Sequence, residues 1–305
     1  MGLRQTKDML LRKFLPLNWL RPENVLMTVG RSYPLQKLPF ESPSLDVSCG
    51  DGLFSFITAG GSIEPAFDRF LYLNTKGYHE HKDIHENYDA DKYSVPVTSP
   101  PVYRFTAGTD WKTSMIRKAS ELRFYDKLLL HDSNNIFDFK DELFMTIYSN
   151  SIYWVANSKG CIEEFKRMLV PGGKIYLQVI TDAMLDFSFL QKLNCDGEWF
   201  HIIDRGCKAT YKSMKTKKWW LELFKNTGLQ VLEVIPTFSR LQANVRNIGL
   251  RPIAPYLIEM SNLIEKKHRD RIKSEYCNTM EKLIKPLVEV DPGDNPVDFL
   301  FVLTK

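Results

Sequence analysis

The sequence predicts an α/β fold in which a mostly parallel sheet is doubly wound, with helices on both faces. Two observations support this fold class. Seven short runs are rich in Val, Ile, Leu and aromatic residues without polar alternation, which is typical of central strands covered on both faces. Helical segments lie between many of these runs, as in sheets built from crossover units. The predicted strands are 44–47, 103–109, 127–131, 144–149, 174–180, 229–235 and 297–303.

Three helices are predicted between these strands, over residues 113–122, 160–169 and 217–227, and Gly228 should end the last of them. Two connections, at about 60–102 and 237–296, are longer than simple crossovers. We expect these mainly helical insertions to cap one rim of the sheet. In the second insertion, one helix face is formed by Tyr276, Met280, Leu283, Ile284, Leu287 and Val288.

Residues 1–43 precede the first strand and are predicted to be a helical segment, while 44–305 form one domain that contains both insertions. Pro16 should end the first helix. Two interpretations stay open: the helix packs on the domain, or residues 2–15 contact an anionic membrane surface. The apolar residues that give this first helix its helical spacing are Leu3, Leu10, Leu11 and Phe14.

The composition is that of an ordinary globular protein. The chain has 305 residues, of which 44% are hydrophobic and 26% are charged, and its net charge of +4 does not require a nucleic-acid partner. The five cysteines form no CxxC pair and no zinc spacing, which is typical of reduced thiols in a cytoplasmic protein. No apolar run approaches the roughly 18 residues that a membrane span needs.

The stretch LDVSCGDG, residues 45–52, predicts a ligand-binding turn between a strand and a helix. Gly50 and Gly52 permit a tight turn and let a ligand approach the backbone, while the following helix directs free N–H groups at it. The next three predicted strands end at polar residues. Because ligands bind at the carboxyl ends of strands in open α/β sheets, we expect these groups to share one site. They are Asp110, Asp132 and Asn150.

Five stretches of the sequence closely resemble the class I S-adenosylmethionine-dependent methyltransferases. They are LDVSCGDG (45–52), GTDWKTSMIRKA (108–119), LLLHDSNN (128–135), FMTIYSNSIYWV (144–155) and EFKRMLVPGGKIYLQV (164–179). The resemblance implies a Rossmann-like fold of seven strands, methyltransferase activity, and S-adenosylmethionine as cofactor. The final run DFLFVLTK (298–305) looks like the antiparallel seventh strand of that family.

The resemblance also implies a role for each matching position in cofactor binding. The loop around the methionine part would be formed by Asp46, Ser48, Gly50 and Gly52. The nucleoside would be held by Asp110 at the ribose, Trp111 at the adenine face, Asp132 at the adenine amino group and Ser133 beside it. The sulfonium and amino-acid end would lie near Ser149 or Asn150.

Three positions depart from the family pattern. Ser48 stands where the family usually has its first glycine, which suggests a tighter loop or weaker cofactor binding. Met145 replaces an acidic residue often found early in the fourth strand. Asp46 and Asp110 are 64 positions apart, far more than the family needs, so an insertion separates the two halves of the cofactor site.

Methyl transfer from a sulfonium is an in-line displacement in which the protein mainly aligns the acceptor and excludes water. An oxygen or nitrogen acceptor can require a general base. His201 is the candidate, either as that base near the mouth of the site or as a structural histidine. Residues that could line the acceptor pocket, or equally belong to the core, are Tyr153, Trp154, Tyr211 and Trp219.

We expect a small-molecule acceptor, because no NPPY-like tetrapeptide follows the fourth strand and no RNA-binding module is present. The overall pattern, including the stretch NIGLRPIAPYLI (residues 247–258), is similar to bacterial methyltransferases associated with surface polysaccharides or other specialised metabolites. This resemblance implies an acceptor such as a sugar or a lipid-linked sugar. Two alternatives stay open. The basic run Lys208–Lys218 could contact RNA or a protein substrate, or it could be a solvated helix face. The fold could also serve as a non-catalytic binding protein.

The first insertion contains the stretch GYHEHKDIHENYDADKY, residues 77–93, in which histidines and carboxylates alternate. Their spacing matches no closed zinc site, so we expect a solvated charged segment and no bound metal.

Overall fold

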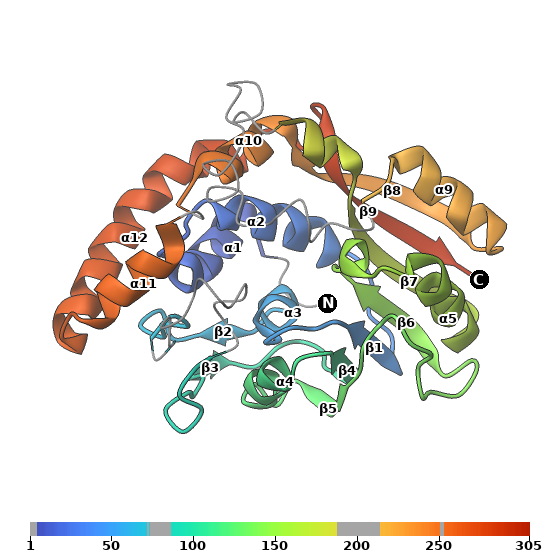
Figure 1. Cartoon of the computed structure of the whole chain (residues 1–305), viewed down its shortest axis with the longest axis horizontal. Coiled ribbons are helices and arrows are strands. Elements are labelled where there is room, and N and C mark those ends of the chain that lie inside the picture. Colours follow the sequence, from blue (N-terminus) through green and yellow to red (C-terminus); the bar gives the residue numbers. More distant parts are fainter. Residues whose placement is uncertain (1–4, 72, 74–86, 188–213, 251–252) are drawn as a thin grey trace.

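The computed structural model describes residues 5–71, 73, 87–187, 214–250 and 253–305. Its central element is a seven-stranded sheet with the order β5-β4-β1-β6-β7-β9-β8 (Figure 1). Strand β9 is antiparallel to its neighbours β7 and β8, whereas the other pairs of this sheet are parallel. The predicted mostly parallel sheet with an antiparallel last strand is therefore confirmed. The strands are β1 (Ser44–Val47), β4 (Phe105–Asp110), β5 (Tyr125–Leu130), β6 (Phe144–Ser149), β7 (Leu169–Ile180), β8 (Gln230–Ser239) and β9 (Pro296–Thr304).

Strands β1 and β6 begin and end where the sequence predicts, but β7 and β8 are longer. β7 begins at Leu169, which pairs with Phe144, and the register then shifts so that Lys174 pairs with Thr146. The intervening turn is accommodated as a bulge in the ladder, which is why β7 starts before the predicted position. β8 continues to Ser239 because it stays paired with β9.

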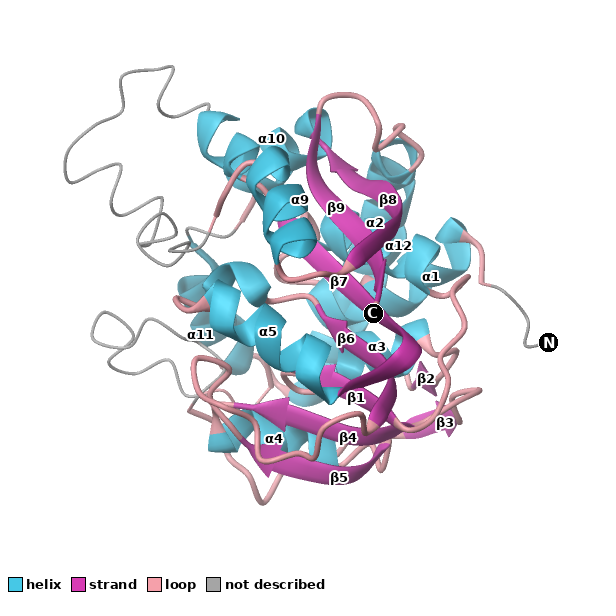
Figure 2. Ribbon diagram, turned by 90° about the vertical axis from the view of Figure 1, so that its right-hand side faces the viewer, coloured by secondary structure: helices cyan, strands magenta, loops and turns pink. Residues whose placement is uncertain are grey.

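Helices cover both faces of the sheet (Figures 1 and 2). On one face, α5 (Ser158–Met168) and α9 (Lys217–Asn226) pack Phe165, Trp220 and Phe224 against the strands. Opposite them lie α1 (Lys7–Phe14), α2 (Asn24–Leu35) and α3 (Leu53–Thr58). Neighbouring residues of β7 enter the two different cores, Ile175 on the α5 side and Tyr176 on the α1 side. This explains why the strand sequences show no polar alternation.

The predicted helices are present as α4 (Thr113–Ser120), α5 and α9. Gly228 has a φ of 71° directly after α9, as expected for a helix stop that needs a left-handed residue. Two short 3-10 helices complete this part of the chain, η2 (Ile152–Trp154) and η3 (Asp182–Phe187).

The N-terminal helix α1 packs inside the molecule. The side chains of Leu10, Leu11 and Phe14 are buried in the main core, and the Thr6 side chain caps the helix by accepting a hydrogen bond from the Met9 backbone. After α1 the chain continues as a 3-10 helix, η1 (Pro16–Asn18). The interpretation of residues 2–15 as a lipid-contacting helix is therefore wrong for the described residues 5–15, because the apolar face that would enter the lipid is covered by protein.

The two insertions differ in structure. The described part of the first contains a small antiparallel pair, β2 (Ser62–Ile63) and β3 (Val97–Ser99), and no helix. The second is helical, as predicted. Ile284 and Val288 are buried, but Leu283 is 61% exposed, so the predicted apolar face is wrong at that position. The helices of the second insertion are α10 (Arg240–Ile248), α11 (Ala254–Asn262) and α12 (Lys266–Val288).

A buried ion pair joins the two insertions. Arg269 of α12 contacts the Asp68 carboxylate at 2.8 Å, and both side chains are almost fully enclosed. Asp68 also accepts a hydrogen bond from the Trp19 indole, while Arg269 donates to Ser261. This network holds the first insertion against α11 and α12. Among the described helices, none is long and apolar enough to cross a bilayer.

Candidate functional site

The turn after β1 has the geometry of a ligand-binding loop. Ser48, Gly50 and Gly52 all have left-handed φ values, of 57°, 60° and 74°. A Cβ on Gly50 would have no neighbour within 4 Å, so this part of the backbone faces open space. Gly52 precedes the first residue of α3 and directs that helix away from the loop. The side of Gly50 where a Cβ would stand is thus open, whereas its backbone N–H is donated to Asp110.

Asp110 connects the ends of β1 and β4. One carboxylate oxygen accepts from the Gly50 backbone N–H at 3.0 Å, and the other accepts from the Lys112 N–H at 2.9 Å. Burial raises the pKa of Asp110, although these two hydrogen bonds oppose the shift. The predicted juxtaposition of the glycine loop and Asp110 is present in the structure.

Asp46 lies beneath the loop rather than at its open side. It is buried and accepts a hydrogen bond from the Tyr125 hydroxyl at 2.8 Å. Desolvation by burial raises its pKa to about 7, and the hydrogen bonds from Ser55 and Tyr125 offset only part of this shift. Asp46 therefore links β1 to β5 below the site.

The end of β5 contributes Ser133 and Asp132. The Ser48 and Ser133 hydroxyls are 3.3 Å apart, so the β1 and β5 ends meet directly. Asp132 is exposed and accepts from the backbone and the side chain of Asn134. Trp111 is 62% exposed, with the Lys112 ammonium 4.9 Å from the centre of its ring. These groups border the same side of the sheet as Asp110.

The end of β6 contributes Ser149 and Asn150. Ser149 is buried, and its hydroxyl accepts from the Ser151 backbone. The Asn150 carbonyl accepts from the Arg31 guanidinium at 3.2 Å. Tyr153 is buried beside Arg31, whereas the neighbouring Trp154 is half exposed. His201 and Tyr211, the predicted base and a predicted pocket wall, lie outside the described residues.

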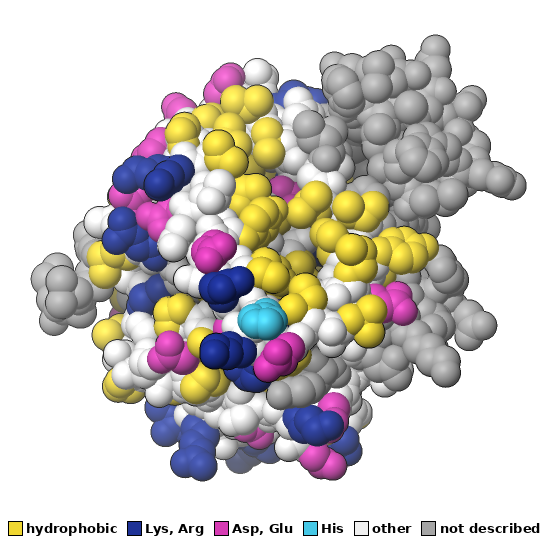
Figure 3. All heavy atoms as spheres, turned by 90° about the vertical axis from the view of Figure 1, so that its left-hand side faces the viewer, with side chains coloured by type: hydrophobic (Ala, Val, Ile, Leu, Met, Phe, Trp, Pro, Cys, Tyr) yellow, Lys and Arg dark blue, Asp and Glu magenta, His cyan; other side chains and the backbone are white. Residues whose placement is uncertain are grey.

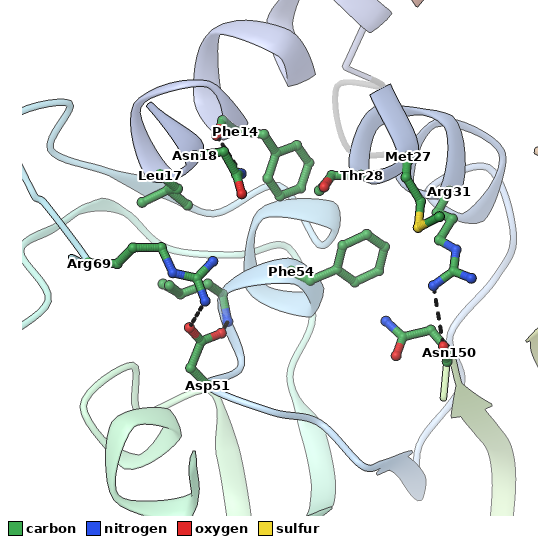
Figure 4. Close-up of a pocket in the computed structure, with 11 residues that line it drawn as sticks. Phe14, Leu17, Asn18, Met27, Thr28, Arg31, Asp51, Phe54, Arg69 and Asn150 are labelled. Carbon is green, nitrogen blue, oxygen red and sulfur yellow. Dashed lines mark hydrogen bonds and ion pairs between the residues drawn. The ribbon is translucent and has the colours of Figure 1, made fainter. Parts of the chain in front are cut away.

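A cavity of about 190 Å³ lies between the glycine loop and the N-terminal helices (Figure 4). Asn150 is the one cavity residue that the sequence analysis had assigned to the site. The others come from α1, η1, α2, the glycine loop, the start of α3 and the first insertion, and they are Phe14, Leu17, Asn18, Met27, Thr28, Arg31, Asp51, Leu53, Phe54 and Arg69. Apart from Asp51, which lies in the LDVSCGDG stretch, no local sequence signal marks them, because they become neighbours only when the N-terminal helices pack on the sheet.

The charged groups of the cavity are present as ion pairs. Arg69 and Asp51 approach to 2.8 Å across it (Figure 4). Arg31 is buried and holds Asp298 of β9 with two hydrogen bonds, of 2.6 and 3.2 Å. Each guanidinium thus has its own carboxylate, and the cavity has no excess charge from these four groups.

The remaining predicted groups are placed as follows. In the basic run, Lys215, Lys217 and Lys218 are exposed around the start of α9. The Lys218 ammonium lies 3.9 Å from the Glu222 carboxylate. The earlier lysines of the run lie outside the described residues. Trp219 packs at the edge of the second core. In the part of the chain that the structure describes, no group of three or more His, Cys, Asp or Glu side chains could hold a metal ion. The histidines at 79, 81 and 85 lie outside that part.

Three comparisons with known proteins gave different results. No protein-family model and no curated protein matches the chain. It is similar to a solved S-adenosylmethionine-dependent methyltransferase from Mesorhizobium loti, with a TM-score of 0.47 and 13% identity over 90% of this chain and 98% of that one. It is also similar to methyltransferases from Geobacter sulfurreducens and Thiobacillus denitrificans, both in complex with S-adenosyl-L-homocysteine. Their TM-scores are 0.43, at 15% and 14% identity over 99% of each chain. The seven-stranded sheet with an antiparallel β9 is the one that the sequence analysis predicts.

Proposed function

We propose that the protein is an S-adenosylmethionine-dependent methyltransferase that methylates an oxygen or nitrogen of a small metabolite. The observation that supports this function is the convergence of four strand ends at one site, joined by the contacts of Asp110 with Gly50 and of Ser48 with Ser133. The cavity begins beside this cluster, at Asp51 and Asn150.

The residues present suit this cofactor. The open backbone at Gly50 would face its methionine part, and Asp110 offers a carboxylate at the position expected for the ribose hydroxyls. When bound, S-adenosylmethionine supplies an activated methyl group. The protein then has to orient the acceptor and exclude water, which suits a cavity walled by Phe14, Met27 and Phe54.

The cavity favours an uncharged acceptor group. Its guanidiniums are already paired, so a second anion would compete with Asp51 or Asp298. Asn18, Thr28 and Asn150 offer neutral hydrogen-bonding groups that suit a hydroxyl or an amine. Asp51 is the one carboxylate among the described lining residues that could accept a proton from the acceptor. A sugar, free or linked to a lipid, fits these properties.

Calorimetry with S-adenosylhomocysteine tests the proposal. We expect binding by the wild-type chain and a roughly tenfold or greater loss for Asp110→Ala, because a charged hydrogen-bond acceptor is removed. Asp126→Ala is the matched control, since Asp126 is an exposed carboxylate on β5 that pairs with Arg104. The absence of heat with the wild-type chain would contradict the enzyme, and equal affinity of the two variants would contradict the site.

A further inference from the structure

Arg69 is a charged side chain that the first insertion places at the cavity. Its guanidinium lies 2.8 Å from the Asp51 carboxylate of the glycine loop (Figure 4). The two side chains are 21% and 13% exposed, and both line the cavity. The Asp51 oxygen that does not face Arg69 accepts from the Leu53 backbone N–H at 3.3 Å. The cavity therefore presents one cation and one anion side by side, next to the glycine loop.

Buried contacts on both sides of Arg69 hold its backbone in place. Asp68 precedes it, and one Asp68 oxygen accepts from the Arg269 guanidinium at 2.9 Å. The other Asp68 oxygen accepts at 2.9 Å from the backbone N–H of Phe70, which follows Arg69. Phe70 is itself buried in one apolar cluster with Ile258 of α11. Because the chain is held immediately before and after Arg69, its guanidinium is positioned at the cavity by the fold.

Helix α12 directs a second cation at the same segment. The Lys273 ammonium donates to the backbone carbonyls of Pro65 and Phe67. Lys273 and Arg269 are buried, which is unfavourable for a cation unless it is hydrogen-bonded, as both are. Charged side chains also lie on the outer face of α11 and α12 (Figure 3), and the exposed cations of these turns are Lys266, Lys267 and Arg271. Two inward cations of α12 thus hold the stretch 65–70, which presents Arg69.

We propose that Asp51 and Arg69 together bind the amino-acid end of S-adenosylmethionine, an inference that rests on the proposed function. This end of the cofactor carries one ammonium and one carboxylate. A guanidinium matches a carboxylate with paired N–H donors, and carboxylate oxygens accept from an ammonium. Binding would exchange partners within the pair, so each of the four charges keeps an opposite charge beside it. Arg31 is less suited, because its partner Asp298 is fully buried and would lose its cation.

The position of the pair favours the cofactor over the acceptor as its ligand. Asp51 directly follows Gly50, whose open side would face the methionine part of the cofactor. Gly50 donates to Asp110, the carboxylate expected at the ribose. Asn150, which the sequence places near the amino-acid end, lines the same cavity. A neutral acceptor has no charges to exchange with the pair. In this arrangement Asp51 holds the cofactor and is not free to take a proton from the acceptor.

Calorimetry with two probes tests this inference. S-adenosylhomocysteine has the amino-acid end, whereas 5′-methylthioadenosine has the same nucleoside and sulfur without it. We expect the wild-type chain to bind S-adenosylhomocysteine about tenfold or more tightly than the shorter probe, because only the longer one reaches the charged pair. The double variant Asp51→Asn with Arg69→Met should lose about tenfold or more in affinity for S-adenosylhomocysteine and keep its affinity for 5′-methylthioadenosine. Both charges are removed together, so neither is left without its partner.

The matched control removes an exposed ion pair elsewhere, Asp126→Asn with Arg104→Met, and should bind both probes like the wild type. Equal wild-type affinity for the two probes would overturn the inference without any variant. So would an Asp51 and Arg69 double variant that keeps its affinity for S-adenosylhomocysteine, or one that loses affinity for both probes alike. These results leave cofactor binding by the wild type intact. A wild-type chain that binds neither probe would instead contradict the proposed function itself.

Discussion

Ser48 holds a backbone conformation that glycine adopts more easily. Its φ of 57° lies in the left-handed region, which costs a non-glycine residue about 1–2 kcal/mol. The loop nevertheless continues through Gly50 with the same sign of φ, and the Ser48 hydroxyl reaches Ser133. Ser48 therefore still forms a left-handed turn, although the family that the sequence resembles usually has glycine at this position. Its side chain adds a contact with Ser133, which follows β5.

Substitutions at Ser48 should separate backbone strain from side-chain contact. Ser48→Gly relieves the strain but gives the unfolded chain more freedom, so its free energy of unfolding should stay close to that of the wild type. Ser48→Val should lower it by about 1–2 kcal/mol, because a β-branched residue is least suited to the left-handed region. Urea unfolding measures both, and a valine variant as stable as the wild type would contradict the strain argument.

Asp46 should make stability depend on pH. Its folded-state pKa is raised to about 7, above the unfolded value of about 3.9, because the carboxylate is desolvated. Between these two values the folded state holds a proton that the unfolded state has lost. Stability should therefore fall as pH rises from about 4 to about 7, with a slope of at most about 1.4 kcal/mol per pH unit from this one group.

Asp46→Asn is the variant that isolates this effect. The amide cannot titrate but still accepts from the Tyr125 hydroxyl, so the variant should show a flatter stability profile from pH 4 to 7 than the wild type. Urea unfolding at several pH values gives the difference. Asp126→Asn, at an exposed position on the same sheet, should leave the profile unchanged. Parallel profiles for the wild type and Asp46→Asn would show that Asp46 is not the titrating group.

The site residues divide into those that the sequence could predict and those that it could not. Asp110, Ser133 and Asn150 follow predicted strands, and parallel strands necessarily bring their carboxyl ends together. Arg31 has no such signal, because its carboxylate partner Asp298 is 267 positions away and is brought near only by folding. Arg69 could not be predicted as a site residue either, since it lies in an insertion whose conformation no local sequence pattern determines.

At the scale of elements, the ion pair between Asp68 and Arg269 joins an insertion to a helix. Arg269→Met should lower the free energy of unfolding by about 3–5 kcal/mol, because Asp68 would stay buried without its cation. Arg271→Met is the control on the same helix. Arg271 is exposed and lies 3.8 Å from Glu275, so its loss should cost less than about 1 kcal/mol. Thermal or urea unfolding compares the two.

A double variant tests the mechanism of that loss. Asp68→Asn combined with Arg269→Met removes the buried charge while keeping an acceptor for the Trp19 indole. It should recover part of the stability that Arg269→Met loses. Equal cost for Arg269→Met and Arg271→Met would show that the network does not hold the first insertion.

The limits and contacts of the elements also divide into those that the sequence could predict and those that it could not. Strands β1 and β6 are short, almost entirely buried and followed by turn residues, and their limits could be predicted. The helical pattern of α12 was partly misleading at Leu283, since a long helix that touches the body with only one narrow side leaves other apolar positions exposed. For α1, the pattern showed an apolar face, but it could not show whether protein or lipid covers it.

At the scale of the whole molecule, the N-terminal helices belong to the main core. The guanidinium of Arg31 also ties α2 to Asp298 of β9. Ten apolar residues between positions 5 and 37 are buried in the core on that face of the sheet: Leu10, Leu11, Phe14, Leu15, Leu17, Val25, Leu26, Met27, Val29 and Leu35. The segment before β1 thus completes one face of the fold.

A chain that begins at residue 38 should therefore fail to fold on its own. Burial of one large apolar side chain is worth about 1.5–3 kcal/mol. The loss of ten exceeds the total stability of about 5–15 kcal/mol that is typical of a domain. The truncation would also leave Asp298 buried without Arg31. We expect the 38–305 chain to be aggregated or molten, with no cooperative transition in urea. A chain of residues 5–305 should unfold in one transition, like the full chain. A cooperative transition of the 38–305 chain would show that the N-terminal helices are an added layer rather than part of the folding unit.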